Sequence, residues 1–232
     1  MNQENTTRSE GEVLDRQQPH WENIFSSTES RFGIEPSYPA KMAAGLFKKE
    51  GVKKILELGG GQGRDSCFFA GQGFEVTVID YTENGTRTIK NNAEALGLSE
   101  SVKVLRHDVR GGGERKREGL PFGTGSFDAC YSHMLYCMAL TTEELETLCT
   151  EVRRVLKPGG INLYTARNTG DAHYKTGIHR GEDMYEIKGG FIVHFFSREK
   201  VEKLAREFQS FELEEFEEGE LPRKLYMVSM RK

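Results

Sequence analysis

The sequence predicts an α/β protein with a doubly wound, mostly parallel sheet of seven strands and helices on both faces. Two observations carry this prediction. Short apolar segments alternate five times with segments of helical period, the pattern of parallel strands joined by crossover helices. Two further alternating segments, residues 211–216 and 225–230, close the chain, and we expect them to pair at the sheet edge with an antiparallel C-terminal strand.

The part of the chain ahead of the first strand divides into a tail, an aromatic segment and a helix. Residues 1–19 are polar and have little to bury, so we expect a disordered tail. Residues 20–38 are rich in aromatic side chains, which either pack on the core or fold over a ligand site. Residues 39–49 show an apolar stripe at helical spacing. We expect residues 20–50 to form a lid on a single domain that covers residues 20–232.

From residue 55 onward the elements follow one another as crossover units. Strands are predicted at residues 55–58, 74–80, 102–106, 126–133 and 161–165. Helices are predicted at residues 66–70, 82–96, 141–156 and 197–208, the last two opened by capping residues Thr141 and Ser197. The Lys-Pro-Gly-Gly run at residues 157–160 predicts a tight turn. Residues 168–190 are a polar connection of a length that is usually functional or disordered, and we expect it to border the substrate.

The amino-acid composition limits the kinds of partner that this protein is expected to bind. With 232 residues and a net charge of -4, the chain can bury one core and has no basic stripe that would attract nucleic acid or an anionic membrane. The four cysteines include no C-x-x-C pair and lie in apolar segments, which favours free thiols in a reducing compartment. There is no signal peptide or membrane-length apolar run. We expect a cytoplasmic monomer or homodimer.

Four glycines within five positions, at residues 59–63, follow the first strand and open a helix. Such a turn lets a ligand approach the backbone closely, although a plain tight turn would look the same. The spacing is G-x-G-x-G, whereas dinucleotide sites use G-x-G-x-x-G. Asp65 would compete with a pyrophosphate for the helix N-terminus. A turn flanked by Glu57 and Asp65 is better matched to the cationic groups of S-adenosylmethionine.

A second acidic signal lies at the end of the next strand. Asp80 follows Gly63 at an offset close to that of the carboxylate that accepts hydrogen bonds from ribose hydroxyls in nucleotide-binding α/β units. Acidic residues are also common in ordinary turns. The register with the glycine turn favours the ribose interpretation. In a doubly wound sheet, ligands gather at the carboxyl ends of the strands, which is where these residues fall.

Four motifs, in this order, resemble the class I S-adenosylmethionine-dependent methyltransferases, a Rossmann-like family. They are I-L-E-L-G-G-G-Q-G at residues 55–63, the acid Asp80, H-D-V at 107–109 followed by S-F-D-A at 126–129, and V-L-K-P-G-G at 155–160. The resemblance covers residues 53–232. G-Q-G-R-D-S at residues 61–66 further resembles the small-molecule branch that includes tellurite-resistance and thiopurine-type methyltransferases. No N-P-P-Y or D-P-P-Y run follows the fourth strand, unlike in enzymes that methylate DNA adenine or protein glutamine.

The resemblance implies a set of cofactor contacts. The glycines would approach the methionine part of S-adenosylmethionine beside Glu57, and Asp80 would hold the ribose. Tyr81 would lie against the adenine, Asp108 would accept from its amino group, and Ser132 would sit nearest the transferable methyl group. The implied cofactor-binding residues are Glu57, Gly59, Gly61, Gly63, Asp80, Tyr81, Asp108, Val109 and Ser132.

The acceptor site is predicted from the two segments that the common fold does not require. We expect a small molecule to be enclosed by Trp21, Tyr38, Tyr136, Arg167, His173 and Tyr185. In-line displacement at the methyl carbon needs little acid-base help if the nucleophile is already a soft anion. If a proton must leave, the candidates are His133, His173 and His179, each of which could also be structural. No metal site is expected. An RNA or protein methyltransferase, a nicotinamide-dependent oxidoreductase and a non-catalytic cofactor-binding protein stay open as alternatives.

Overall fold

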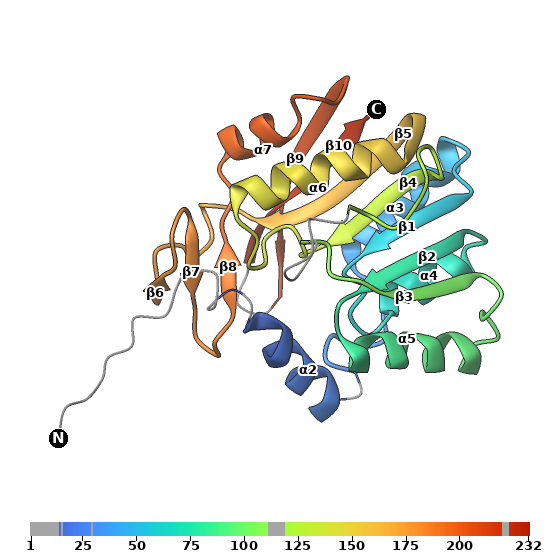
Figure 1. Ribbon diagram of the computed structural model, residues 1–232, viewed down its shortest axis with the longest axis horizontal. Coiled ribbons are helices and arrows are strands. Elements are labelled where there is room, and N and C mark those ends of the chain that lie inside the picture. Colours follow the sequence, from blue (N-terminus) through green and yellow to red (C-terminus); the bar gives the residue numbers. More distant parts are fainter. Residues whose placement is uncertain (1–13, 15, 29, 111–118, 220–222) are drawn as a thin grey trace.

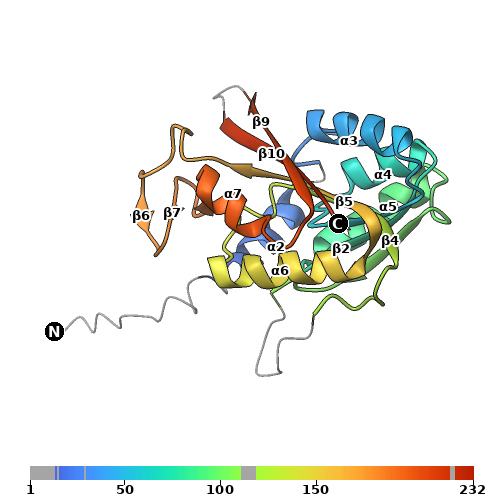
Figure 2. The same ribbon diagram turned by 90° about the horizontal axis from the view of Figure 1, so that it is seen from above.

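The computed structural model describes residues 14, 16–28, 30–110, 119–219 and 223–232, and it folds them as a sheet between helices (Figures 1 and 2). The sheet has seven strands in the order β3-β2-β1-β4-β5-β10-β9, and β10 is antiparallel to both of its neighbours. The predicted fold class is therefore confirmed, including the C-terminal hairpin. The strands are β1 (Lys54–Leu58), β2 (Glu75–Asp80), β3 (Val102–Arg106), β4 (Phe127–His133), β5 (Leu156–Arg167), β9 (Ser210–Glu218) and β10 (Arg223–Arg231).

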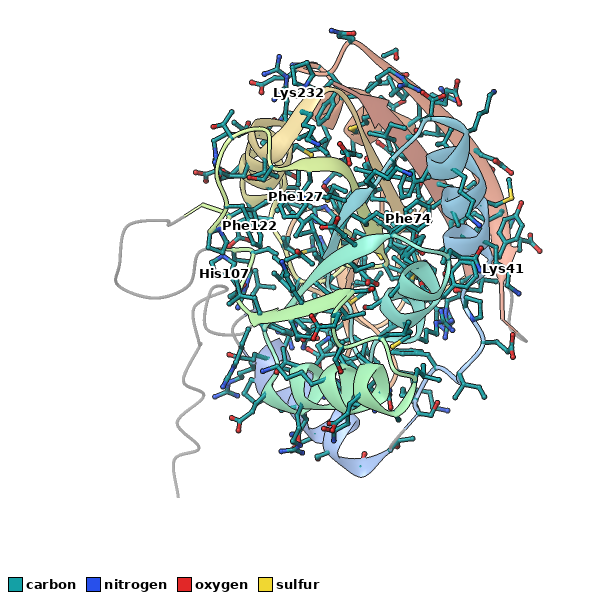
Figure 3. All side chains as sticks on the ribbon, turned by 90° about the vertical axis from the view of Figure 1, so that its right-hand side faces the viewer. Lys41, Phe74, His107, Phe122, Phe127 and Lys232 are labelled. Atoms are coloured by element: carbon teal, nitrogen blue, oxygen red, sulfur yellow. The ribbon has the colours of Figure 1, made fainter. Side chains whose placement is uncertain are left out.

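Helices cover both faces of the sheet and enclose two cores. One core joins α6 and α7 to the sheet, and the other joins α3, α4 and α5 to the opposite face. Phe127 belongs to the first core and Phe74 to the second, and both rings are labelled in Figure 3. The helices are α2 (Gln17–Ser27), α3 (Tyr38–Lys49), α4 (Arg64–Gly71), α5 (Glu83–Ala95), α6 (Thr142–Val155) and α7 (Arg198–Leu204).

Strand β1 shows how the sequence positions the site. Leu56 and Leu58 enter the core beneath α6, whereas Ile55 enters the core beneath α3 and α4. This alternation is that of a pleated strand buried on both faces. β1 is paired with β2 and β4, so its carboxyl end lies at the centre of the sheet. The glycine turn that follows β1 therefore lies at the middle of the ligand-binding edge.

Two predicted boundaries are wrong. The turn at residues 157–160 lies inside β5, because Leu156 already pairs with Phe127 before the register shifts and Ile161 pairs opposite Ala129. Gly159, with a φ of 76°, allows the extra residues to loop out without ending the strand. Helix α7 ends at Leu204 rather than at residue 208. In contrast, the predicted capping box of α6 is present, with Thr141 and Glu144 bonded in both directions.

The polar connection at residues 168–190 is more regular than predicted. It contains β6 (Ile178–His179) and β7 (Met184–Glu186), which pair with β8 (Ile192–His194) as a small antiparallel sheet. Short strands of two and three residues with glycines between them give too weak a periodic signal to be recognised in the sequence. The connection is therefore a small sheet of its own rather than an irregular loop.

The chain is packed from a point earlier than residue 20. Helix α2 begins at Gln17, inside the predicted tail, and Leu14 is buried. The Gln17 side chain donates to the Gly190 carbonyl at 3.0 Å and accepts from the Ile192 amide at 3.2 Å. Residues 1–13 and 15 of the predicted tail, and residues 111–118 between β3 and β4, lie outside the described residues.

Other expectations concern the cysteines and the membrane. All four cysteines are buried free thiols, as predicted. Within the described ranges, no helix combines the length and the apolar character needed to cross a membrane.

Candidate active site

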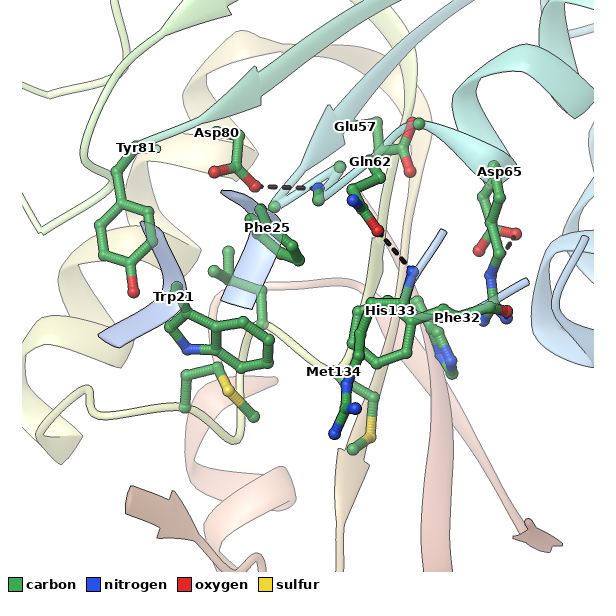
Figure 4. A pocket seen from close by; sticks show the side chains of 18 of the residues that line it. Trp21, Phe25, Phe32, Glu57, Gln62, Asp65, Asp80, Tyr81, His133 and Met134 are labelled. Atoms are coloured by element: carbon green, nitrogen blue, oxygen red, sulfur yellow. Dashed lines mark hydrogen bonds and ion pairs between the residues drawn. The ribbon is translucent and has the colours of Figure 1, made fainter. Parts of the chain in front are cut away.

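A cavity of about 1290 Å³ runs along the carboxyl ends of β1, β2, β4 and β5. Its lining includes the glycine turn at residues 59–63 and side chains from α2 and the loop after it. Figure 4 shows Asp80 and Tyr81 toward one end, and His133, Met134 and Phe32 toward the other. We call these the glycine-turn end and the aromatic end.

The glycine turn is held by strand β2. The Gly59 amide donates to the Ile79 carbonyl at 2.8 Å, and the Gly61 amide donates to Asp80 Oδ2 at 2.9 Å. Gly59, Gly61 and Gly63 have φ values of 71°, 58° and 85°, a region that favours glycine. A Cβ on Gly61 would come no closer than 3.5 Å to Phe25 Cζ, so the face of this residue borders the cavity.

Asp80 is a buried acceptor at this end. Besides the Gly61 amide, its carboxylate accepts from the Thr82 amide at 2.9 Å and from Thr82 Oγ1 at 2.6 Å. Burial raises the pKa of Asp80, while these hydrogen bonds oppose the shift. Tyr81 lines the cavity next to it, and burial also raises the pKa of its phenol.

Glu57 is almost fully buried beneath the turn, and Ser66 Oγ donates to it. Desolvation, followed by the neighbouring charge of Asp65, raises the pKa of Glu57 to about 8. Asp65 is committed to another contact, because it accepts from the Ser37 amide at 2.8 Å and from Ser37 Oγ at 2.7 Å. Ser37 is the N-cap of α3, so Asp65 fastens that helix to the turn.

Two further predicted cofactor residues line the cavity at the end of β3. Asp108 and Val109 both border it, as does Arg110. Arg110 Nη2 lies 2.8 Å from Asp108 Oδ2, and the Arg110 amide donates to Oδ1 at 3.0 Å. A base amino group would therefore share the Asp108 carboxylate with this ion pair.

Four rings form one wall of the cavity, which runs from the side of Tyr81 to Phe32. Trp21 and Phe25 lie on α2, and Phe32 lies in the loop after it. Phe191 is the residue just before β8, and all four side chains line the cavity. The Trp21 centroid lies 5.4 Å from that of Phe25, 6.3 Å from Phe32 and 5.1 Å from Phe191. Trp21 is thus the centre of a continuous aromatic surface.

Helix α2 and its loop are fastened over the cavity by polar contacts. Glu22 accepts from the Glu83 amide and, at 3.0 Å, from the Asn84 amide at the N-terminus of α5. Gln62, in the glycine turn, accepts from the Arg31 amide at 2.7 Å. Gln17 holds the other side of α2 through the bonds to the segment at residues 190–192 described above.

His133 is the base candidate that the structure places in the cavity. Its Nδ1 lies 2.8 Å from Thr165 Oγ1, and its Nε2 lies 3.4 Å from Glu218 Oε1. Glu218, the last residue of β9, also lines the cavity. Met134, next to His133, has a φ of 70° and lines the cavity too, so the chain turns sharply where β4 meets the site.

The structure does not place three of the predicted site residues in the cavity lining. Ser132 is fully buried and donates to the Leu58 carbonyl at 3.1 Å, so it does not reach the cavity. Tyr136 is fully buried and stacked on Tyr164 with centroids 4.1 Å apart. Tyr38 lies outside the cavity lining, half exposed and packed against Phe216.

Of the remaining acceptor residues, Arg167 lines the cavity but His173 and Tyr185 do not. Arg167 Nε donates to Asp171 Oδ2 at 3.0 Å, and Arg167 Nη2 lies 2.8 Å from His173 Nδ1. The structure therefore does not place the His173 ring in the cavity, where a base would act, and this ring contacts a buried ion pair instead. His179 also lies outside the lining, with Nε2 at 2.8 Å from the Glu182 carbonyl.

Several site residues were not among the sequence predictions. Glu218 and Gln62 gave no signal as site residues, because both owe their position to contacts with distant segments. In the sequence, nothing distinguishes Phe191 and Met138 from apolar residues of the core, although both line the cavity. A periodic pattern cannot separate a ring that lines a cavity from one that fills a core.

Comparison with known proteins finds similarity over part of the chain. Residues 55–160 match the family described as Methyltransferase domain. A sterol 24-C-methyltransferase of Gibberella zeae is 34% identical over 123 residues, which is 52% of this chain and 29% of that protein. The matched segments span 29% and 37% of the lengths of the curated relatives, so the chain corresponds to only part of them.

Two solved structures have the same fold. The 1,6-didemethyltoxoflavin-N1-methyltransferase of Burkholderia thailandensis, which holds 1,6-didemethyltoxoflavin and S-adenosylhomocysteine, is 17% identical with a TM-score of 0.67, over 94% of this chain and 90% of that one. TehB of Haemophilus influenzae is 17% identical with a TM-score of 0.61, over 91% of this chain and 67% of that one. Residues 55–160 thus match the methyltransferase-domain family, in agreement with the predicted resemblance to the class I S-adenosylmethionine-dependent methyltransferases, and the two solved structures share the fold of the chain.

Proposed function

We propose that this protein binds S-adenosylmethionine and transfers its methyl group to a small-molecule acceptor. The observation that carries the proposal is one continuous cavity that joins the glycine turn and Asp80 to the aromatic wall. Its volume of about 1290 Å³ exceeds the roughly 300–1,000 Å³ of a site for one drug-sized ligand, so there is room for two.

The glycine-turn end fits the cofactor. Gly61 presents a face without a side chain, and Asp80, which already accepts three hydrogen bonds, keeps acceptor capacity for a ribose hydroxyl. Glu57 lies beneath the turn with a pKa of about 8, so it is mainly protonated at neutral pH. A cationic ammonium group nearby would favour its ionised form. Tyr81, Asp108 and Val109 border the space assigned to the base.

The aromatic end fits a small acceptor. Helix α2 lies over the cavity and is fastened on two sides, by Glu22 to α5 and by Gln17 to residues 190–192. A wall of this kind restricts the acceptor by size and excludes water from the reacting atoms. The aromatic rings around Trp21 suit a flat or apolar acceptor.

When bound, the cofactor supplies an electrophilic methyl group and a sulfonium leaving group. The chain's own part is to hold the acceptor in line with that methyl group and to keep water out, and such positioning can supply most of the acceleration. His133 and Glu218 are the titratable side chains at the aromatic end that bear on proton removal.

Two measurements test the proposal. Calorimetric titration should show binding of S-adenosylhomocysteine and none of NAD. A screen with methyl-labelled cofactor over thiols, metalloid oxyanions, amines and phenols should label a small product. Binding of NAD alone would support an oxidoreductase instead, and label appearing only in RNA or protein would support a macromolecular methyltransferase.

A further inference from the structure

The polar side chains of the aromatic end form a chain of three. Thr165 Oγ1 accepts the Met134 amide at 3.0 Å and lies 2.8 Å from His133 Nδ1. Thr165 is fully buried, so its single hydroxyl hydrogen needs an acceptor, and among the described residues His133 Nδ1 is the one at hydrogen-bond distance. Nδ1 therefore accepts, and the imidazole carries its hydrogen on Nε2.

This tautomer leaves His133 without a free lone pair. Its Nε2–H faces Glu218 Oε1 at 3.4 Å, and its Nδ1 is occupied by Thr165. Glu218 Oε2, by contrast, has no hydrogen-bond partner among the residues that the structure describes, and this side chain lines the cavity. The group that offers an acceptor atom to a ligand is thus the carboxylate, not the imidazole.

We infer that the Glu218 carboxylate receives the proton of the acceptor's nucleophile, that His133 positions it, and that the acceptor carries this hydrogen on nitrogen or oxygen. The inference rests on the proposed function and identifies its substrate class. It also replaces His133 as the base with the residue that His133 holds. Figure 4 shows His133 toward the same end of the cavity as Phe32 and Met134, where the acceptor is expected.

The step balances without a further reactant. The nitrogen or oxygen lone pair bonds to the methyl carbon while the carbon–sulfur bond breaks and its electron pair stays on sulfur, giving a neutral thioether. Methylation places a positive charge on the acceptor, which makes its N–H or O–H hydrogen more acidic than before, and this proton passes to Glu218 and on to water. Because the proton leaves as the new bond forms, a carboxylate is a strong enough base.

The charge of the pair also selects against anionic acceptors. Burial works against ionisation of Glu218, but the contact with His133 and the positive charges of Arg64 and Arg223 together outweigh it and lower the pKa of this carboxyl. An ionised carboxylate at the aromatic end attracts an N–H or O–H donor and repels a thiolate or a metalloid oxyanion. The acceptor class therefore differs from that of the tellurite-resistance and thiopurine-type enzymes that the glycine motif resembles.

The test compares Glu218→Gln with Glu217→Gln, its neighbour on β9, which is exposed. Methyl transfer is measured to benzimidazole (N–H), 8-hydroxyquinoline (O–H), thiophenol and tellurite, with S-adenosylhomocysteine affinity and thermal melting as checks on cofactor binding and folding. We expect transfer to the N–H or O–H probe. It should fall at least about 100-fold in Glu218→Gln and stay within about twofold in Glu217→Gln, with cofactor affinity unchanged in both.

His133 is tested as a positioning residue. His133→Leu should lower transfer, and His133→Gln, which keeps an N–H donor for Glu218, should recover part of it. A wild-type rate in folded Glu218→Gln, or a wild-type preference for thiophenol or tellurite, overturns the inference. So does wild-type protein that binds S-adenosylhomocysteine and methylates neither the N–H nor the O–H probe. Wild-type protein that does not bind S-adenosylhomocysteine contradicts the proposed function itself.

Discussion

The two ends of the cavity are built in different ways. At the glycine-turn end, the polar contacts join neighbouring strands and their loops, as in the bonds from Gly61 and Thr82 to Asp80. At the aromatic end, side chains converge from α2, the end of β4 and the end of β9. A binding site whose shape is fixed by one short stretch of backbone suits a ligand that is common to a family. A site formed by side chains from several distant segments can change one segment at a time. The first end is therefore expected to be generic and the second specific to this protein.

The largest test of this division is Gly61→Val. A branched side chain would extend from a face that borders the cavity, so S-adenosylhomocysteine affinity should fall by about 100-fold or more while the domain stays folded. Gly51→Val is the matched control, because Gly51 has a φ of 71° and nothing within 4 Å of an added Cβ. It imposes similar backbone strain far from the ligand. Normal affinity in folded Gly61→Val would mean that the cofactor does not lie on the turn.

The second test concerns the buried carboxyl beneath the turn. Because the pKa of Glu57 is raised from 4.5 to about 8, the unfolded chain releases this proton at a lower pH than the folded protein does. Stability from this group is therefore present below pH 4.5 and is lost as pH rises toward about 8, by at most about 1.4 kcal/mol per pH unit. Urea unfolding of the ligand-free protein at pH 5 to 8 should show this loss, and Glu57→Gln should lack it. Equal slopes in the two proteins would place the titrating group elsewhere.

A third test concerns the hydrogen bonds of Asp80 at the glycine-turn end, as distinct from the shape of the turn. Asp80→Ala should weaken S-adenosylhomocysteine binding by about 1 to 3 kcal/mol, the usual cost of leaving buried donors unpaired. The structure adds that the Gly61 amide also loses its acceptor, so part of the loss comes from a looser turn. Asp80→Asn keeps one carbonyl oxygen and should lose less. Wild-type calorimetric affinity in Asp80→Ala would rule out the ribose assignment.

These differences explain which structural features could be predicted from the sequence. The glycine turn, Asp80 and the capping box of α6 were predicted correctly as structural features, because each depends on residues close in sequence or at a fixed offset. The hairpin of β9 and β10 was predicted for the same reason, since its alternation is local. Strand bounds were less secure, as the start of β5 at Leu156 shows.

The aromatic end could not be read in the same way. Ser132 and His133 differ by one position, and strand alternation places only the second in the cavity. Tyr136 was expected to help enclose the acceptor, but a tyrosine ring also packs well in a core, and its stacking partner Tyr164 lies on β5. Glu218 was one acid among many in β9 until the fold placed it against His133.

The smallest test asks whether α2 closes the aromatic end independently of the cofactor. Glu22 accepts amide hydrogens at the N-terminus of α5, where a negative charge is worth about 0.5 to 1 kcal/mol. Glu22→Gln should therefore destabilise the docking of α2 by about that amount. Hydrogen exchange in α2 should become faster while S-adenosylhomocysteine affinity stays the same. Glu35→Gln is the control, because Glu35 is exposed and has no hydrogen bond or ion pair within the described ranges.

A deletion carries the same question further. Removing residues 1–27 takes away α2, with the Gln18 bond to the Tyr81 carbonyl, but spares Ser37, which caps α3 and binds Asp65 next to the glycine turn. If the two ends are independent, this protein should still bind S-adenosylhomocysteine and should accept a wider range of acceptors at a lower rate, because the aromatic wall is open to water. Unchanged rate and acceptor range would show that α2 is no lid. Loss of cofactor binding would show that the two ends are one structural unit, and the division between a generic and a specific end would fail.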